Sequence, residues 1–277
     1  MKSLFSILAL VLAVFPGPAA PQTDPHELVL MTFNIRYGTA EDGPNSWENR
    51  RALVAGLIAR VSPDVLAIQE GLAFQLEELG EVLGSYRKLG QHRDGGLEGE
   101  FSGLYVKEER VRILRWGEFW LSPTPDSVAS VGWDAVLPRM VVWAEIEKVG
   151  SGAPVRVYGT HFDHRGGTAR LESARLIARH AEQGPPAVIM GDLNAEEDSE
   201  PLGIFFRLGY RSAFRSLHPE SDLGTFNGFR DPKGGERIDH ILLDPRIRPR
   251  EAKIVVDRVG AEWPSDHFPV NAVVSVK

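Results

Sequence analysis

The sequence has 277 residues, of which 43% are hydrophobic and 25% are charged, a composition typical of a globular protein that buries one large core. It contains no cysteine, which excludes a disulfide framework. The formal net charge of −7 argues against a surface that binds long nucleic acids nonspecifically, because such surfaces are basic.

The first residues differ from the rest of the chain. Lys2 is followed by an apolar run over 4–15 and then by small residues, which predicts a secretory signal peptide over 1–20 and a single domain over 21–277. A bilayer span needs about 20 apolar residues, so we expect no stable membrane span after cleavage; a retained N-terminal anchor is the alternative. The expected location of the protein is periplasmic or extracellular.

Short β-rich runs alternate with amphipathic segments along the chain. The predicted strands cover 28–35, 64–68, 111–121, 140–146, 155–161, 187–190, 238–243, 254–256 and 270–276. The predicted helices cover 47–61, 72–83 and 168–181, with caps at 45–46 and 167–168. Long extended pairs over 102–121 and 138–161 favour antiparallel pairing. We therefore expect an α/β (α+β) fold of two packed mixed sheets flanked by helices.

Polar side chains stand where the predicted strands end or begin. Those in question are Asn34, Glu70, His161, Asp192, Asn194, Asp239, Asp266 and His267. Strand ends open on the crevice where α/β proteins bind ligands, so these side chains are expected to converge on one face.

The residue types at these strand ends suit phosphoester cleavage. Mg²⁺ prefers oxygen ligands, and Asn34 and Glu70 supply an amide and a carboxylate, with Mn²⁺ as a possible substitute. A zinc site is disfavoured, because the sequence has no cysteine and no HExxH motif. Cleavage also needs groups that activate water and stabilise charge on phosphate oxygens, which Asp192, His161 and His267 can provide.

Six segments in order carry a resemblance to a known family. They are Thr32-Phe33-Asn34-Ile35-Arg36, Ile68-Gln69-Glu70, Gly159-Thr160-His161, Gly191-Asp192-Leu193-Asn194, Arg237-Ile238-Asp239-His240 and Ser265-Asp266-His267. The chain resembles the endonuclease/exonuclease/phosphatase superfamily, and is similar to an exported bacterial subgroup of it. The resemblance implies a DNase I-like four-layer sandwich.

The resemblance also implies roles for the site residues. It gives a catalytic set of His161, Asp192, Asn194, Asp239 and His267 and a metal set of Asn34, Glu70 and Asp266. Glu70 resembles the principal metal ligand and Asn34 a residue that binds the metal or its water. Asp192 resembles the carboxylate that aligns or deprotonates water, with Asn194 on the phosphate. His267, held by Asp239, resembles the histidine at the scissile phosphate, and His161 resembles a group that stabilises the pentacoordinate state.

Arginines near these segments are candidates for substrate contact, because guanidinium binds phosphate through two N–H groups. Arg36, Arg93 and Arg139 are the expected contacts. Gly-rich 93–100 is either a mobile active-site loop or a plain turn. Two interpretations remain open for Asp163 and His164, which either enter the pocket or belong to an ordinary loop. Four aromatic side chains either stack on a substrate or fill the core: Trp47, Trp120, Trp133 and Phe226. The remaining arginines of the predicted helices are expected on solvated faces: Arg50, Arg51, Arg170 and Arg175.

The expected function is hydrolysis of a phosphomonoester or phosphodiester by a monomeric enzyme. The acidic net charge favours a small phosphorylated metabolite or lipid headgroup over nucleic acid as the substrate. A secreted nuclease, of the DNase I type or a poly(A)-type exonuclease, is the first alternative, and a noncatalytic binding module on the same fold is the second. A glycosidase that uses Glu70 and Asp192 leaves the histidines and asparagines unexplained.

Overall fold

The computed structural model describes residues 26–230, 235–258, 260 and 262–276. The predicted signal peptide over 1–20 lies outside the described residues. Within the described part of the chain, no helix combines the length and the apolar character that crossing a membrane requires.

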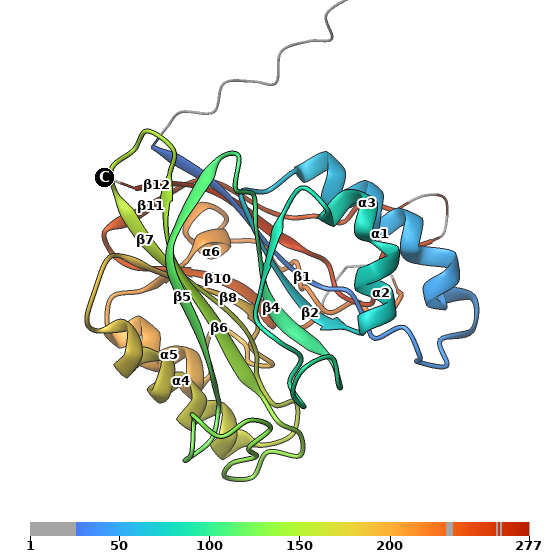
Figure 1. The fold of residues 1–277 in the computed structure, drawn as a ribbon, viewed down its shortest axis with the longest axis horizontal. Helices are drawn as coiled ribbons and strands as arrows, with labels where there is room; N and C mark the ends of the chain where they lie inside the picture. The colour runs from blue at the N-terminus through green and yellow to red at the C-terminus, as the bar shows by residue number, and fades with distance from the viewer. Residues whose placement is uncertain (1–25, 231–234, 259, 261, 277) are drawn as a thin grey trace, which may run out of the picture.

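Two six-stranded sheets form the centre of the molecule (Figure 1). The first has the order β11 (Ile247–Ile254), β12 (Val270–Val276), β1 (Glu27–Asn34), β2 (Val65–Gly71), β4 (Phe101–Val106), β3 (Arg87–Leu89). The second has the order β5 (Val111–Trp120), β6 (Met140–Lys148), β7 (Pro154–His161), β8 (Ala187–Asp192), β10 (Asp239–Leu243), β9 (Arg211–Ser212). The pairs β1–β2 and β7–β8 are parallel, and the other pairs are antiparallel. Both sheets are therefore mixed, as predicted.

Helices cover the outer face of each sheet (Figure 1). α1 (Trp47–Val61), α2 (Ala73–Glu78) and α3 (Gly80–Leu83) pack on the first sheet, and α4 (Gly167–Ala181) and α5 (Glu200–Arg207) pack on the second. The short η1 (Gly43–Asn45) precedes α1, and α6 (Ala213–Leu217) contacts β10 and β11. The largest apolar cluster lies between the sheets and contains Leu30, Val142 and Met190. The predicted four-layer sandwich is confirmed.

Several predicted boundaries were wrong for local reasons. β11 covers Ile247–Ile254 rather than the predicted 254–256, because its charged run over 248–251 lacks apolar alternation and pairs with β12 through a register shift. The helix expected over 72–83 is divided at Leu79, which ends α2 and precedes α3. The predicted caps do not cap through their side chains; instead the Asp134 carboxylate accepts the backbone N–H groups of Thr168 (3.1 Å) and Ala169 (2.6 Å) at the start of α4.

A buried ion pair links the two sheets. Lys148 of β6 donates to Oδ2 of Asp64 at 2.6 Å, and the Asp64 side chain is 0% exposed. Asp64 also accepts the backbone N–H of Val29 at 2.9 Å and pairs with Arg110 at 3.3 Å. The carboxylate therefore depends on partners from both sheets.

Replacing Lys148 with methionine is expected to lower the free energy of unfolding by about 3 kcal/mol, because the variant leaves a buried carboxylate short of one cation. Urea unfolding followed by circular dichroism measures this change. Arg112→Met is the control, since Arg112 pairs with Glu147 at the surface and its loss is expected to cost less than about 1 kcal/mol. Equal effects of the two substitutions would contradict the assignment.

Candidate active site

The ends of strands from both sheets open into one cavity of about 670 Å³. Among the predicted site residues, those that line it are Arg36, Glu70, Arg139, His161, Asp192, Asn194, Asp266 and His267. Asn34 and Asp239 do not line the cavity, but each is hydrogen-bonded to a residue that does. The structure thus brings together residues that lie as far apart in the chain as 34 and 267.

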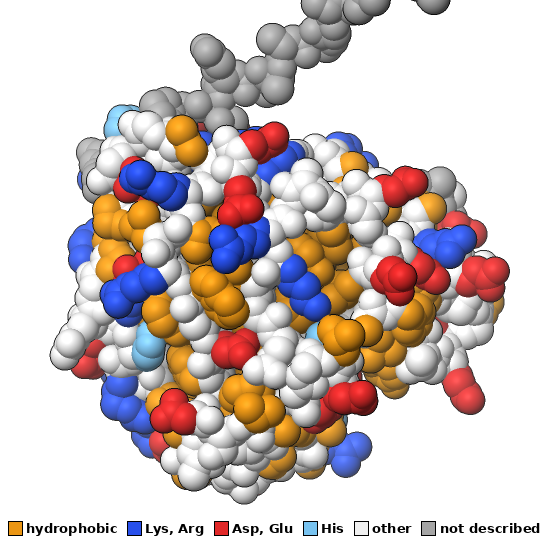
Figure 2. Space-filling model, in the orientation of Figure 1, with side chains coloured by type: hydrophobic (Ala, Val, Ile, Leu, Met, Phe, Trp, Pro, Cys, Tyr) orange, Lys and Arg blue, Asp and Glu red, His pale blue; other side chains and the backbone are white. Residues whose placement is uncertain are grey.

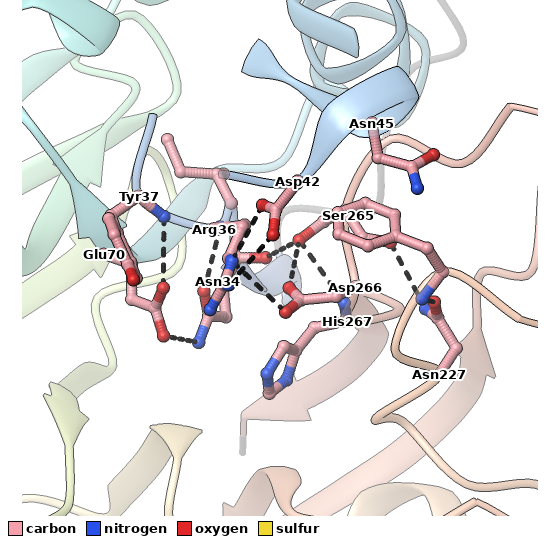
Figure 3. Close-up of polar contacts among 12 residues, drawn as sticks. Asn34, Arg36, Tyr37, Asp42, Asn45, Glu70, Asn227, Ser265, Asp266 and His267 are labelled. Carbon is pink, nitrogen blue, oxygen red and sulfur yellow. Dashed lines mark hydrogen bonds and ion pairs between the residues drawn. The ribbon is translucent and has the colours of Figure 1, made fainter. Parts of the chain in front are cut away.

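Asn34, the last residue of β1, joins carboxylates from the two sheets. Its Nδ2 donates to Oε1 of Glu70 at 2.9 Å and to Oδ2 of Asp192 at 3.0 Å (the first contact is drawn in Figure 3). Its Oδ1 accepts the backbone N–H of Arg36 at 3.0 Å. Asn34 in this structure therefore positions the two carboxylates with its amino group and the turn at Arg36 with its oxygen.

Backbone strain concentrates at the cavity. Arg36, Glu70, Asn194 and Phe229 are nonglycine residues with φ of 58°, 63°, 46° and 60°, and all four line the cavity. Such conformations cost about 1–3 kcal/mol each and persist only where surrounding contacts enforce them. For Glu70 one such contact is visible in Figure 3, where its Oε2 accepts the backbone N–H of Tyr37 at 3.1 Å.

Asp192, His267 and Asp239 form a buried chain of titratable groups. Nδ1 of His267 lies 2.8 Å from Oδ2 of Asp239, and Nε2 of His267 lies 3.8 Å from Oδ2 of Asp192. Burial alone lowers the pKa of His267, but the charge and hydrogen bond of Asp239 raise it well above its ordinary value. Burial, followed by the charge of Asp239, raises the pKa of Asp192 to about 7. A carboxylate with this pKa is suited to general-base chemistry near neutral pH.

The pKa of His161 is shifted in the opposite direction from that of His267. It is buried, its Nε2 lies 3.4 Å from Oδ2 of Asp192, and burial together with the charges of Arg139 and Arg93 lowers its pKa well below the ordinary value. His161 is therefore neutral at physiological pH. Its Nδ1 is buried and has no hydrogen-bond partner among the described residues.

Arg139 lines the cavity and carries buried donors without a hydrogen-bond partner in the described part of the chain. Its side chain is 5% exposed, and its Nε and Nη1 have no hydrogen-bond partner in the described part of the chain. Its Nη2 lies 3.2 Å from Nδ1 of His164, and its Nε lies 3.7 Å from Oδ2 of Asp163. Buried N–H groups without acceptors are costly, so this guanidinium is suited to an anion that enters the cavity.

The structure also places Asp163 and His164, for which the sequence left two interpretations. The Asp163 carboxylate accepts three backbone N–H groups, from Arg165 (2.9 Å), Gly166 (2.7 Å) and Val136 (3.2 Å). It therefore fixes the loops around Arg139 and does not line the cavity, whereas His164 does.

The other two predicted substrate arginines differ from each other. Arg36 lines the cavity and lies between Asp42, which it contacts twice at 3.0 Å, and Asp266 at 3.5 Å (Figure 3). Arg93 does not line the cavity; its Nη1 donates to Glu100 at 2.6 Å. Glu100 lines the cavity instead, and burial raises the pKa of its carboxyl.

Glu100 was missed because it stands at the end of the Gly-rich segment 93–100, outside any motif. The segment is closed by backbone hydrogen bonds from Arg93 N to Glu100 O (3.0 Å) and from Asp94 N to Glu98 O (3.2 Å). These bonds favour the plain turn over a mobile loop.

The structure also shows which of the four aromatic residues lie in the core and which line the cavity. Trp47 and Trp120 are core residues, at 4% and 3% exposure. Phe226 is 38% exposed, lines the cavity and packs edge-on against His267 with ring centroids 5.1 Å apart. Trp133 is 37% exposed but does not line the cavity.

The donor set of the cavity fits a divalent cation. Ligand atoms of Glu70, His161 and Asp192 lie within 4.8 Å of one another. The Asp266 carboxyl lies in the same cavity, where burial and the charge of Glu70 raise its pKa although His267 and Arg36 oppose this. A cation offsets the repulsion between neighbouring carboxylates, and oxygen donors suit a hard one.

Three solved structures illustrate what the chain is similar to. An endonuclease/exonuclease/phosphatase family protein from Bacteroides thetaiotaomicron is 29% identical, with a TM-score of 0.84 and coverage of 91% of this chain and 98% of that chain. The endonuclease/exonuclease/phosphatase from Bacteroides vulgatus is 30% identical, with a TM-score of 0.83 and coverage of 91% and 99%. A mannosyl-6-phosphatase from Bacteroides thetaiotaomicron is 29% identical, with a TM-score of 0.81 and coverage of 89% and 99%.

Among curated proteins, no match to this chain was found. The sequence model of the endonuclease/exonuclease/phosphatase family matches residues 31–267, a range that includes every residue of the cavity described above. The protein therefore belongs to the endonuclease/exonuclease/phosphatase family and is a phosphoric ester hydrolase.

Proposed function

We propose that this hydrolase uses Mg²⁺, with Mn²⁺ as a substitute, to cleave a phosphomonoester or phosphodiester of a small phosphorylated metabolite or lipid headgroup. The observation that carries the proposal is the convergence of Glu70, Asp192 and His267 on one cavity, beside the unpaired donors of Arg139. Carboxylates for a cation, a base of suitable pKa and a guanidinium for phosphate are the parts that this reaction needs.

In this proposal, carboxylates bind the cation and activate the attacking water. Glu70 and Asp266 are the proposed ligands, and a bound Mg²⁺ supplies polarisation of a phosphoryl oxygen and charge neutralisation. Asp192, ionised above a pKa of about 7, accepts a proton from the attacking water. The Nδ2 atom of Asn34 donates to Glu70 and to Asp192 and so holds these two carboxylates in place.

The phosphate is assigned to the cationic and imidazole side chains. Protonated His267, held by Asp239, donates from Nε2 to a phosphate oxygen. Arg139, which lines the cavity, donates to nonbridging oxygens, and neutral His161 donates a single N–H. Asn194 and Arg36 line the same cavity and are the remaining proposed phosphate contacts; Arg93 acts through Glu100.

Charge and similarity support a small substrate. Figure 2 shows acidic and basic side chains interspersed on the face it presents, with no continuous basic stripe. One of the similar structures is named a mannosyl-6-phosphatase, which acts on a small phosphorylated molecule by its name. Export to the periplasm or the extracellular space and a monomeric state are parts of the proposal that come from the sequence alone.

A nuclease is the second candidate, because Phe226 is 38% exposed beside His267, where it can stack on a base. The Michaelis constant for a polyanionic substrate rises steeply with salt, whereas the constant for a small phosphate ester changes little. Measuring both constants between low and physiological salt separates the candidates.

Removal of divalent cations is expected to abolish turnover. Purified protein treated with EDTA should show no hydrolysis of nucleotides, sugar phosphates, phospholipids or single-stranded nucleic acid, and added Mg²⁺ or Mn²⁺ should restore it on at least one substrate. Undiminished hydrolysis in EDTA would contradict the proposed cofactor. A wild-type protein that binds no Mg²⁺ in calorimetry would instead support a noncatalytic binding module.

A further inference from the structure

Arg50 of α1 is buried, although its place on an amphipathic helix predicted a solvated side chain. It is 2% exposed and is among the largest fully buried side chains of the described chain. Its neighbour Arg51 is exposed, as the helix pattern predicted, and it pairs with Glu78 at 3.5 Å. The two arginines therefore have different tasks.

Within the described part of the chain, the guanidinium of Arg50 donates hydrogen bonds to backbone carbonyls and to no carboxylate. It donates to the carbonyl oxygens of Asn45 (3.0 Å), Arg36 (2.9 Å), Pro264 (3.3 Å) and Ile35. Burial lowers the pKa of Arg50 to about 10, against the opposing charges of Asp266 and Asp42. Burying a cation without an ion-pair partner is costly, and so these carbonyl contacts call for a reason beyond core packing.

Three of the four bound carbonyls, those of Ile35, Arg36 and Pro264, belong to the two chain segments that carry the site. Ile35 and Arg36 follow Asn34 directly, and Pro264 directly precedes the Ser265–His267 segment. The same two segments meet again where Oγ of Ser265 donates to the carbonyl oxygen of Asn34 at 2.8 Å (Figure 3). Arg50 thus spans the junction between the carboxyl end of β1 and the chain that enters β12.

Arg50 binds a strained turn whose backbone N–H groups donate to the side chains of Asn34 and Glu70. Arg36 has a φ of 58°, its N–H donates to Asn34, and the next N–H, that of Tyr37, donates to Glu70. The carbonyl oxygen of Arg36 receives a second donor, Nε2 of the buried Gln75, at 3.0 Å. Arg50 and Gln75 therefore hold the carbonyl of this turn while its amides hold the side chains of the site.

We propose that Arg50 is a positioning residue that joins the Asn34 and Asp266 segments and so sets the geometry of the cation site. The inference rests on the proposed function, since Glu70 and Asp266 are the proposed ligands. Arg50 touches neither the cation nor the substrate. A lysine carries the same charge but offers one nitrogen, so it cannot reach carbonyls in three segments at once.

Binding of Mn²⁺ to metal-free protein, measured by calorimetry without substrate, tests the inference. Arg50→Lys is expected to weaken Mn²⁺ binding by about tenfold or more, which is the effect that loss of an outer-shell contact has at other metal sites. Arg51→Lys, on the same helix, is the matched control and is expected to leave the affinity unchanged.

Rescue separates positioning from a general loss of structure. Arg50→Ala, checked for folding by circular dichroism, is expected to regain part of the Mn²⁺ affinity when free guanidinium is added at a sub-denaturing concentration, and sodium chloride at equal ionic strength is expected to have no such effect. Arg50→Gln serves as a second variant if the alanine variant does not fold.

Two results would overturn the inference in distinguishable ways. If Arg50→Lys binds Mn²⁺ as tightly as the wild type and merely melts at a lower temperature, Arg50 contributes to stability alone. If the wild-type protein binds neither Mn²⁺ nor Mg²⁺, the proposed function fails first, and the role of Arg50 fails with it.

Discussion

Asp192→Asn is expected to lower kcat by about 10³- to 10⁴-fold while the protein stays folded. The substitution keeps the size of the side chain and one of the two oxygens, which accept from Asn34 and from the backbone N–H of Asn194. It removes the only group in the described cavity whose raised pKa, about 7, suits it to take a proton from water near neutral pH. Initial rates at saturating Mg²⁺ on a generic phosphodiester, such as a nitrophenyl ester, measure the change.

The same variant is expected to melt at a higher temperature than the wild type in EDTA at pH 8. A carboxyl whose folded pKa lies above its unfolded value of 3.8 binds more protons when folded, so its ionisation destabilises the protein as pH rises from about 4 through about 7. Asparagine cannot ionise and avoids this cost. Asp198→Asn, an exposed position six residues later, is the control for both measurements. Full activity of Asp192→Asn would refute the assigned base.

The second large effect is expected at Asp239. Asp239→Asn should lower kcat by about 10²- to 10⁴-fold, because the carboxylate that lies 2.8 Å from Nδ1 orients the His267 ring and favours its charged form. The pH–rate profile of the wild type should rise as Asp192 ionises and fall as His267 loses its proton. Since Asp239 is the main group that raises the pKa of His267 against burial, its neutralisation should move the alkaline limb to lower pH.

A matched control lies at the other end of the same strand. Asp244 directly follows β10, pairs with Arg246 at 2.7 Å and contacts no histidine of the site. Asp244→Asn should therefore keep the wild-type profile. An alkaline limb that stays in place in Asp239→Asn would show that a group other than His267 controls it.

Local sequence pattern was sufficient to predict the strands that carry the site. β2 and β8 begin with continuous apolar runs and β1 and β7 are mostly apolar, because the four strands are buried along most of their length. A polar residue at the end of such a run, such as Asn34, lies at the carboxyl end of its strand, where ligands bind in α/β sheets. The motif residues therefore converged as predicted, although the chain separates the first from the last by more than two hundred positions.

Local sequence pattern did not predict the environment of charged side chains whose partners lie far away in the chain. Arg50 and Arg51 are adjacent on one helix, yet the first is buried against carbonyls of 35, 36 and 264 and the second is solvated. Arg93 is paired with Glu100 and so does not line the cavity. Helical periodicity gives the direction of a side chain but not what lies there.

The sequence by itself determined most of the long strands, the two mixed sheets, the family and most of the residues that meet in the cavity, because burial on a sheet and polarity at the end of a strand are properties of short segments. The tertiary structure alone decided that Asn34 offers its amino group to two carboxylates, that Asp192 and His267 have raised pKa values, and that Arg50 is buried. Desolvation and hydrogen-bond partners depend on segments that are distant in the chain, and those become defined only when the two sheets pack.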